Sequence, residues 1–186
     1  MKPTFAWECF ADTDVARCLL IECGLDFHID PADSHAHCQG NVVNHLFHEG
    51  KASFGMVDED PKRSHHSTRD ILTFVYRGAY LDWGVFEDKY LIVLKPELER
   101  CFLESMKTVE LCSAMAKDPK TINEALGKRD HPWHKIFSDE LALLYRKSQD
   151  TKTVTFITEL EDAVREILRR LAAEVPKGES GKETNG

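Results

Sequence analysis

The segment Tyr90–Leu94 (YLIVL) constrains the fold more than any other part of the sequence. A strand that is apolar at every position has no face suited to water, and such strands occur in parallel sheets that are covered on both sides. Pro96 follows almost at once and suits the first turn of a helix, where an amide hydrogen is not needed. A helix from there to about Met106 would join a buried strand directly to a helix, which indicates an α/β domain.

Strands and helices alternate along the first half of the chain. Apolar runs and helical spacing predict strands at 4–10, within 26–38 and at 53–57, and helices at 13–23, 41–47 and 67–77. Strands that alternate with helices favour right-handed crossovers, and these crossovers produce a mainly parallel sheet flanked by helices.

The second half of the chain is predicted to be helical. Thr121 and Glu124 have the spacing of a capping box and predict the start of a short helix. Further helices are expected from 138 or 139 to about 147 and, with a strongly amphipathic pattern, over 154–173. The sequence therefore predicts a C-terminal helical part.

The length of 186 residues suits one domain with a single hydrophobic core. We expect an α/β domain over residues 1–175, with a core at about 4–106, a helical part at about 107–175 and a disordered tail at 176–186. No apolar run reaches the roughly 18 residues needed to cross a bilayer, and the N-terminus lacks the apolar core of a signal peptide. We therefore expect a cytoplasmic protein without a membrane partner.

The charge and the cysteines limit the classes of ligand. The formal net charge is −8, whereas proteins that bind nucleic acid through its phosphates are usually basic. Either nucleic acid is not the ligand, or metal ions, a local basic patch or a partner protein supply the missing positive charge. The six cysteines form no Cys-x-x-Cys pair and most lie in apolar patterns, so we expect reduced core residues.

Acidic residues lie at the ends of two predicted strands. Glu8 lies near the end of the first strand, and Asp58 and Asp60 follow the third. Ligands of parallel α/β sheets gather at the carboxyl ends of the strands, so these three carboxylates would meet there if the strands are neighbours. Carboxylates that lie close together repel one another unless a cation neutralises them, and Mg²⁺ or Mn²⁺ prefers such oxygen ligands.

Basic residues follow the acidic pair. Lys62, Arg63 and Arg69 could bind a phosphate group of a substrate, and Lys95 at the end of the apolar strand is a further candidate. The alternative is an ordinary exposed loop and a lysine whose ammonium group simply reaches solvent.

The order of these elements resembles the Toprim domain of topoisomerases, primases and nucleases of the overcoming-lysogenization-defect group. In that domain a strand ends in Glu and a later strand ends in Asp-x-Asp. The resemblance covers about residues 4–106, and Leu91–Leu103 (LIVLKPELERCFL) is similar to a strand-Pro-Glu-helix segment of small Toprim-like proteins in bacterial genomes. It implies a Toprim- or Rossmann-like sheet and a Mg²⁺ or Mn²⁺ site in which Glu8, Asp58 and Asp60 serve phosphodiester chemistry.

The resemblance leaves the further ligands open. A later Toprim aspartate could correspond to Asp12 or Asp14, and Glu97 or Glu99 could be an additional ligand; Asp12 and Glu99 are included in the predicted metal site. The sequence also departs from the family, because Cys9 stands where Toprim proteins usually have glycine after the glutamate. This departure favours a non-catalytic module.

Other metal sites and folds are alternatives. Histidines and a cysteine could bind zinc, but their spacing does not follow the usual paired pattern: His35, His37, Cys38, His65 and His66. In a flavodoxin-like regulatory or binding domain, Asp58 would instead be a signalling residue or a helix cap. His131 and His134 flank Trp133 in what we interpret as a buried aromatic turn.

The leading hypothesis is a Toprim-like nuclease or phosphodiesterase that depends on a divalent metal, acts on DNA or RNA and serves bacterial defence. The alternative is a non-catalytic Toprim-like module that binds a partner protein or a nucleotide. The acidic net charge favours the alternative, whereas the carboxylates at the strand ends favour the enzyme.

Overall fold

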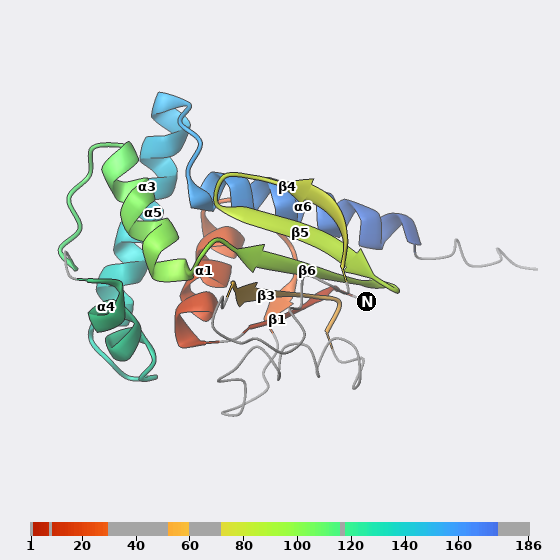
Figure 1. Ribbon diagram of the computed structural model, residues 1–186, viewed down its shortest axis with the longest axis horizontal. Helices are drawn as coiled ribbons and strands as arrows, with labels where there is room; N and C mark the ends of the chain where they lie inside the picture. The colour runs from red at the N-terminus through yellow and green to blue at the C-terminus, as the bar shows by residue number, and fades with distance from the viewer. Residues whose placement is uncertain (1, 8, 30–51, 60–71, 116–117, 175–186) are drawn as a thin grey trace, which may run out of the picture.

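A six-stranded sheet forms the centre of the structure, a computed structural model that describes residues 2–7, 9–29, 52–59, 72–115 and 118–174. In spatial order its strands are β2 (His28–Ile29), β1 (Thr4–Ala6), β3 (Phe54–Asp58), β6 (Lys89–Leu94), β5 (Leu81–Phe86) and β4 (Thr73–Arg77) (Figure 1). From β2 to β6 the neighbouring strands are parallel, and β6, β5 and β4 pair antiparallel. The prediction of a mainly parallel α/β sheet is confirmed.

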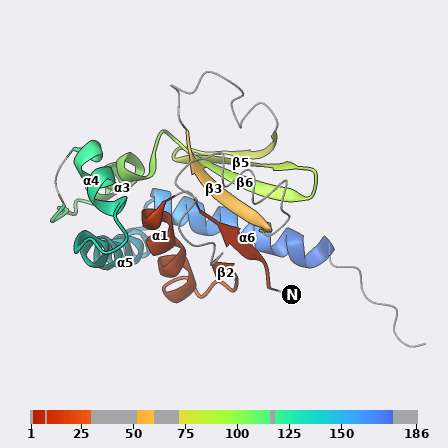
Figure 2. The same cartoon turned by 90° about the horizontal axis from the view of Figure 1, so that it is seen from below.

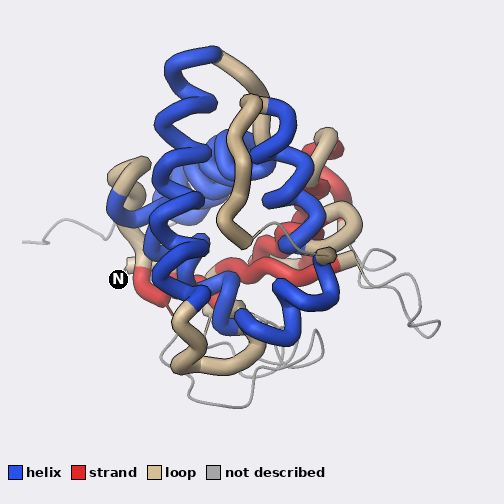
Figure 3. The backbone as a smooth tube through the Cα atoms, turned by 90° about the vertical axis from the view of Figure 1, so that its left-hand side faces the viewer, coloured by secondary structure: helices blue, strands red, loops and turns tan. Residues whose placement is uncertain are grey.

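The helices of the described residues flank this sheet. They are α1 (Phe10–Ile21), α3 (Leu98–Thr108), α4 (Pro119–Leu126), α5 (Trp133–Thr151) and α6 (Phe156–Glu174). Helix α6 runs along the sheet, and α3, α4 and α5 gather at one end of the molecule (Figures 1 and 2). Viewed from that end, the helices stand in front of the strands (Figure 3). The C-terminal helical part is therefore confirmed.

The apolar strand β6 is buried on both faces, as its sequence predicts. Ile92 belongs to the main core, which also contains Leu19 of α1 and Leu160 of α6. Leu91 and Val93 face the other way, into a smaller apolar cluster on the opposite side of the sheet. Burial of such a side chain contributes roughly 1.5–3 kcal/mol, so both faces of β6 stabilise the fold.

The β4–β5 hairpin corrects the sequence-based interpretation. We predicted a helix over 67–77, but Thr73–Arg77 forms β4, and residues 67–71 lie outside the described part. Thr, Phe, Val and Tyr in this segment are residues that favour strands. Its partner β5 was not predicted, because buried Asp82 and Gly84 interrupt its apolar pattern. A Cβ at Gly84 would lie 2.6 Å from the Thr73 carbonyl oxygen, so glycine allows the close approach of β4.

Several element boundaries also differ from the predictions. Phe10 begins α1 instead of ending β1, and α5 begins at Trp133, before the predicted start at 138 or 139. Asp118 caps α4, because its Oδ1 accepts a hydrogen bond from the Thr121 amide at 3.0 Å. The predicted helix at 41–47 lies outside the described residues. Among the helices that are described, none is both long and apolar enough to cross a membrane.

Candidate functional site

The carboxyl ends of β1 and β3 lie side by side. The two strands are parallel neighbours, with Ala6 opposite Gly55. From β1 the chain passes through α1 to β2 on one side, whereas β3 lies on the other side of β1. Such a reversal of strand order creates the crevice in which ligands of α/β sheets bind. Asp58 is the last residue of β3, whereas Glu8 and Asp60 lie outside the described residues.

The described acidic residues of this region each accept a hydrogen bond. Asp58 Oδ1 accepts from the amide of Leu98, the first residue of α3, at 2.9 Å. Asp12 Oδ2, in the first turn of α1, accepts from the Cys9 amide at 2.9 Å. Glu99 Oε1, in the first turn of α3, accepts from Asn123 Nδ2 at 3.1 Å. The starts of α1 and α3 thus both hold acidic side chains, which the positive ends of the helix dipoles favour.

The Cys9 side chain lies within electrostatic reach of these carboxylates. Burial raises the pKa of the Cys9 thiol well above its usual value, and the negative charges of Asp12, Glu99 and Asp58 raise it further. Asp12 and Glu99 are themselves buried. Hydrogen bonds place Asp58 at the start of α3, where Glu99 lies, and Asp12 beside Cys9, although these predicted ligands lie far apart in the sequence.

The donor chemistry of this acidic cluster fits a hard cation. Carboxylate oxygens are the preferred ligands of Mg²⁺ and Mn²⁺, whereas the protonated Cys9 thiol suits neither a hard cation nor a nucleophilic role. Within the described residues, no group of three or more His, Cys, Asp or Glu side chains is arranged to hold a metal ion. The two central predicted ligands, Glu8 and Asp60, are not among those residues.

The predicted phosphate-binding residues are only partly described. Lys95 Nζ lies 2.8 Å from Asp82 Oδ1 and also donates to the Gly78 carbonyl oxygen. Its ammonium group therefore serves the fold by neutralising a buried carboxylate. The other candidates, Lys62, Arg63 and Arg69, lie outside the described residues, as do the zinc candidates between 35 and 38 and at 65 and 66.

The cysteine prediction needs one correction. Cys18, Cys23 and Cys101 are buried and unpaired, and burial is the main cause that raises the pKa of each thiol to about 12. Cys112, in contrast, is exposed, because it lies in the loop after α3 instead of in an apolar element.

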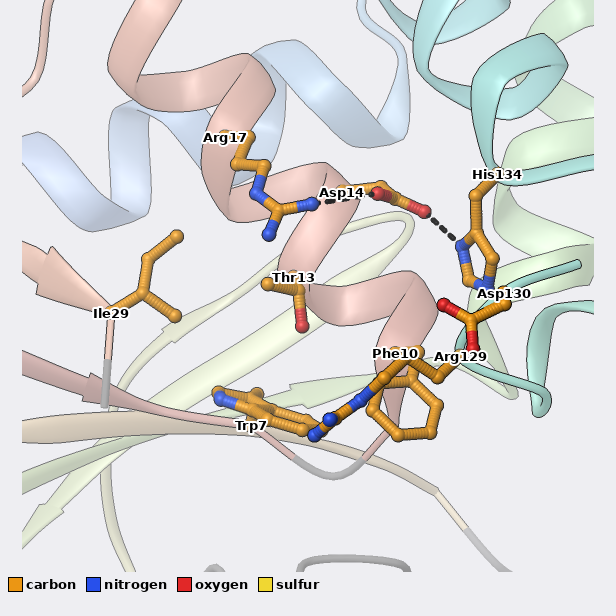
Figure 4. Close-up of a pocket in the computed structure, with 9 residues that line it drawn as sticks. All are labelled: Trp7, Phe10, Thr13, Asp14, Arg17, Ile29, Arg129, Asp130 and His134. Carbon is orange, nitrogen blue, oxygen red and sulfur yellow. Dashed lines mark hydrogen bonds and ion pairs between the residues drawn. The ribbon is translucent and has the colours of Figure 1, made fainter. Parts of the chain in front are cut away.

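A pocket of about 470 Å³ opens beside the first turns of α1 (Figure 4). Its lining comes from three parts of the chain: Trp7, Phe10, Thr13, Asp14 and Arg17 around the start of α1, Ile29 at the end of β2, and Arg129, Asp130 and His134 around the start of α5. The volume lies within the range of about 300–1,000 Å³ that is common for small-molecule sites. The pocket adjoins the carboxyl end of β1, as does the acidic cluster.

One wall of the pocket holds an acid–histidine pair in which Asp14 is buried and His134 is half-buried. His134 Nδ1 lies 2.5 Å from Asp14 Oδ2, and His134 Nε2 lies 2.9 Å from the Lys128 carbonyl oxygen. A carbonyl oxygen only accepts, so Nε2 carries a hydrogen. Asp14 Oδ1 also lies 3.6 Å from Arg17 Nη1, so Asp14 contacts both the histidine and an arginine. Burial raises the pKa of Asp14, and the hydrogen bond from His134 opposes this increase.

Nothing in the sequence alone predicts this pocket. The sequence suggests Asp14 only as a possible metal ligand and a buried aromatic turn around His134. The two residues are 120 positions apart, and nothing in their local sequence indicates that they meet.

Comparisons of the chain with protein-family models, with curated proteins and with solved structures find no match. The Toprim resemblance therefore stays a prediction that rests on the residues and the order of the elements.

Proposed function

We propose that the chain is a Toprim-like phosphodiesterase or nuclease that uses Mg²⁺ or Mn²⁺ and acts on nucleic acid. The observation that supports this most is the position of Asp58, whose carboxylate accepts from the Leu98 amide beside Glu99, with Asp12 hydrogen-bonded to Cys9. Three acidic groups in one partly buried place favour a cation among them. The proposal places them where an α/β sheet usually binds its ligand.

In this proposal Glu8, Asp58 and Asp60 hold the metal ion, and Asp12 and Glu99 complete the acidic surroundings. A bound Mg²⁺ or Mn²⁺ ion would polarise a phosphoryl oxygen and activate a water molecule. Lys62, Arg63 and Arg69 would attract the phosphate backbone, which an acidic chain otherwise repels. We leave Lys95 out of the substrate-binding set because it already pairs with Asp82. A role in bacterial defence stays part of the proposal.

The sharpest test substitutes Asp58 by asparagine. Asparagine keeps an oxygen that accepts from the Leu98 amide, so the start of α3 is preserved, but it removes the negative charge. We expect Mn²⁺ at about 100 times its dissociation constant to stabilise the wild type by about 2.7 kcal/mol, or roughly 5–10 °C in Tm. Asp58→Asn should lose both this shift and Mn²⁺-dependent cleavage of single-stranded DNA or RNA.

Asp118→Asn is the matched control. Asp118 caps α4 as Asp58 caps α3, but it lies outside the acidic cluster. This variant should keep the metal-induced shift and the cleavage activity. Equal metal-induced shifts in wild type and Asp58→Asn would refute the metal site, and cleavage that survives in Asp58→Asn would point to a contaminating nuclease.

A second candidate is a non-catalytic module that binds a partner protein or a nucleotide. The observation in its favour is that the three described carboxylates each accept a hydrogen bond inside the fold, as helix-capping or helix-joining groups do. This candidate predicts that Mn²⁺ leaves the Tm unchanged and that ligand binding persists in EDTA.

A further inference from the structure

The pocket beside α1 combines aromatic surface with positive charge. The rings of Trp7 and Phe10 lie with centroids 5.5 Å apart, and the guanidinium carbon of Arg129 lies 5.4 Å from the Phe10 centroid. Trp7, Phe10 and Arg129 group together along one side of the pocket, with Thr13 directed toward them (Figure 4). A flat aromatic ligand would find both a stacking surface and a cation there.

Two arginines line the pocket, although the chain is acidic as a whole. Among the described lining residues, the guanidinium groups of Arg17 and Arg129 accompany the carboxylates of Asp14 and Asp130, and Arg17 Nη1 lies 3.6 Å from Asp14 Oδ1. The chain as a whole carries a formal charge of −8. Guanidinium groups are typical partners of a phosphate group, because they donate two parallel hydrogen bonds to its oxygens.

The Thr13 hydroxyl provides an independent observation. Its Oγ1 is buried and has no hydrogen-bond partner among the described residues, although Thr13 lines the pocket. A buried hydroxyl that lacks a partner destabilises the fold by roughly 1–3 kcal/mol. A polar ligand in the pocket would relieve this penalty by hydrogen bonding to Thr13, so the free protein carries a group that a ligand can satisfy.

We propose that this pocket binds a nucleoside monophosphate unit, either as a free nucleotide or as one residue of a single strand. The base packs against Phe10 and the edge of Trp7, Thr13 hydrogen bonds to a polar atom of the ligand, and Arg129 and Arg17 bind the phosphate. If the nucleotide in this pocket is also the substrate of the acidic cluster, the inference rests on the proposed function. The binding itself needs no metal ion.

The test is a calorimetric titration in EDTA with AMP, adenosine and ribose 5-phosphate as probes. AMP should bind with a Kd of about 1 mM or tighter, and both fragments at least about tenfold more weakly, because each lacks one half of the recognised group. A short oligoadenylate distinguishes the two sources of the ligand. Binding of the oligonucleotide in preference to AMP assigns the site to a strand, and the reverse assigns it to a free nucleotide.

Two variants localise the binding. Thr13→Val keeps the shape of the side chain and should weaken AMP about three- to tenfold, while the free protein is as stable as wild type or more stable. Arg129→Gln removes an exposed guanidinium group and should weaken AMP about tenfold. The control Lys135→Gln removes one positive charge from α5 outside the pocket and should leave AMP binding unchanged.

The outcomes separate this inference from the proposed function. No heat of AMP binding, or equal binding in wild type and both pocket variants, would overturn the nucleotide site even if Asp58→Asn abolishes Mn²⁺-dependent cleavage. AMP binding that requires Thr13 and Arg129, in a protein without cleavage activity, would support the site and refute the enzyme.

Discussion

Glu159 connects α6 to the β4–β5 hairpin, and its removal has an effect that the structure allows us to estimate. The residue is 5% exposed, and its carboxylate accepts from the Tyr76 hydroxyl at 2.7 Å, the Ala79 amide at 2.9 Å and the Tyr80 amide at 2.7 Å. Each such bond contributes about 1 kcal/mol net to the free energy of unfolding. In the variant, water can replace the carboxylate at exposed Ala79, so we add no larger penalty for an unpaired amide there. We therefore expect Glu159→Ala to lower the free energy of unfolding by about 3 kcal/mol, and Tm by roughly 6–12 °C.

Gly78 provides a second way to break the same contact. A Cβ at this position would lie 1.6 Å from Glu159 Oε1 and 2.6 Å from Tyr76 Cε1, so Gly78→Ala must displace the carboxylate. If the carboxylate is what makes glycine necessary, the double variant with Glu159→Ala should be little less stable than either single variant. The two changes would then be strongly non-additive, as expected for residues in contact.

Urea denaturation followed by far-UV circular dichroism measures these free energies. Asp162→Ala is the control, because Asp162 lies exposed on the same helix and the substitution should change stability by less than about 0.5 kcal/mol. The reasoning fails if Glu159→Ala destabilises no more than Asp162→Ala. It also fails if the effects of Gly78→Ala and Glu159→Ala simply add.

Two further predictions concern thiols and acid stability. In a Cys38→Ser background at pH 8, a thiol reagent should label exposed Cys112 alone in the folded chain, and mass spectrometry that finds labelled Cys101 would contradict its burial. Hydrogen bonds from Arg169 and Arg170 lower the pKa of Glu166 from 4.5 to about 2, so Glu166 stabilises the fold above pH 4.5 and loses this effect as pH falls toward 2. The stability difference between wild type and Glu166→Gln should shrink over that range in urea titrations, and a constant difference would contradict it.

The predictable part of the fold is the part whose pattern is local. Tyr90–Leu94 is apolar throughout and forms the doubly buried strand β6, and the amphipathic spacing over 154–173 forms α6. The β5 strand was missed because its buried Asp82 is stable only beside Lys95, thirteen residues later. The β4 strand was mistaken for a helix because it is an edge strand with mostly exposed residues, which lacks the alternation of a half-buried strand.

At the candidate site, too, the local sequence does not predict which single residues meet in space. The sequence left open whether Asp12 or Asp14 belongs to the acidic cluster, because both lie near the start of a predicted helix. Successive residues of an α-helix turn by about 100°, so these two side chains leave α1 about 200° apart and cannot line one site. Asp12 lies near the Cys9 thiol with Asp58 and Glu99, whereas Asp14 pairs with His134 in the pocket. The first turns of α1 therefore contribute an acidic residue to each of the two candidate sites. The pocket, which is the second of these sites, can be recognised only once the position of α5 is known.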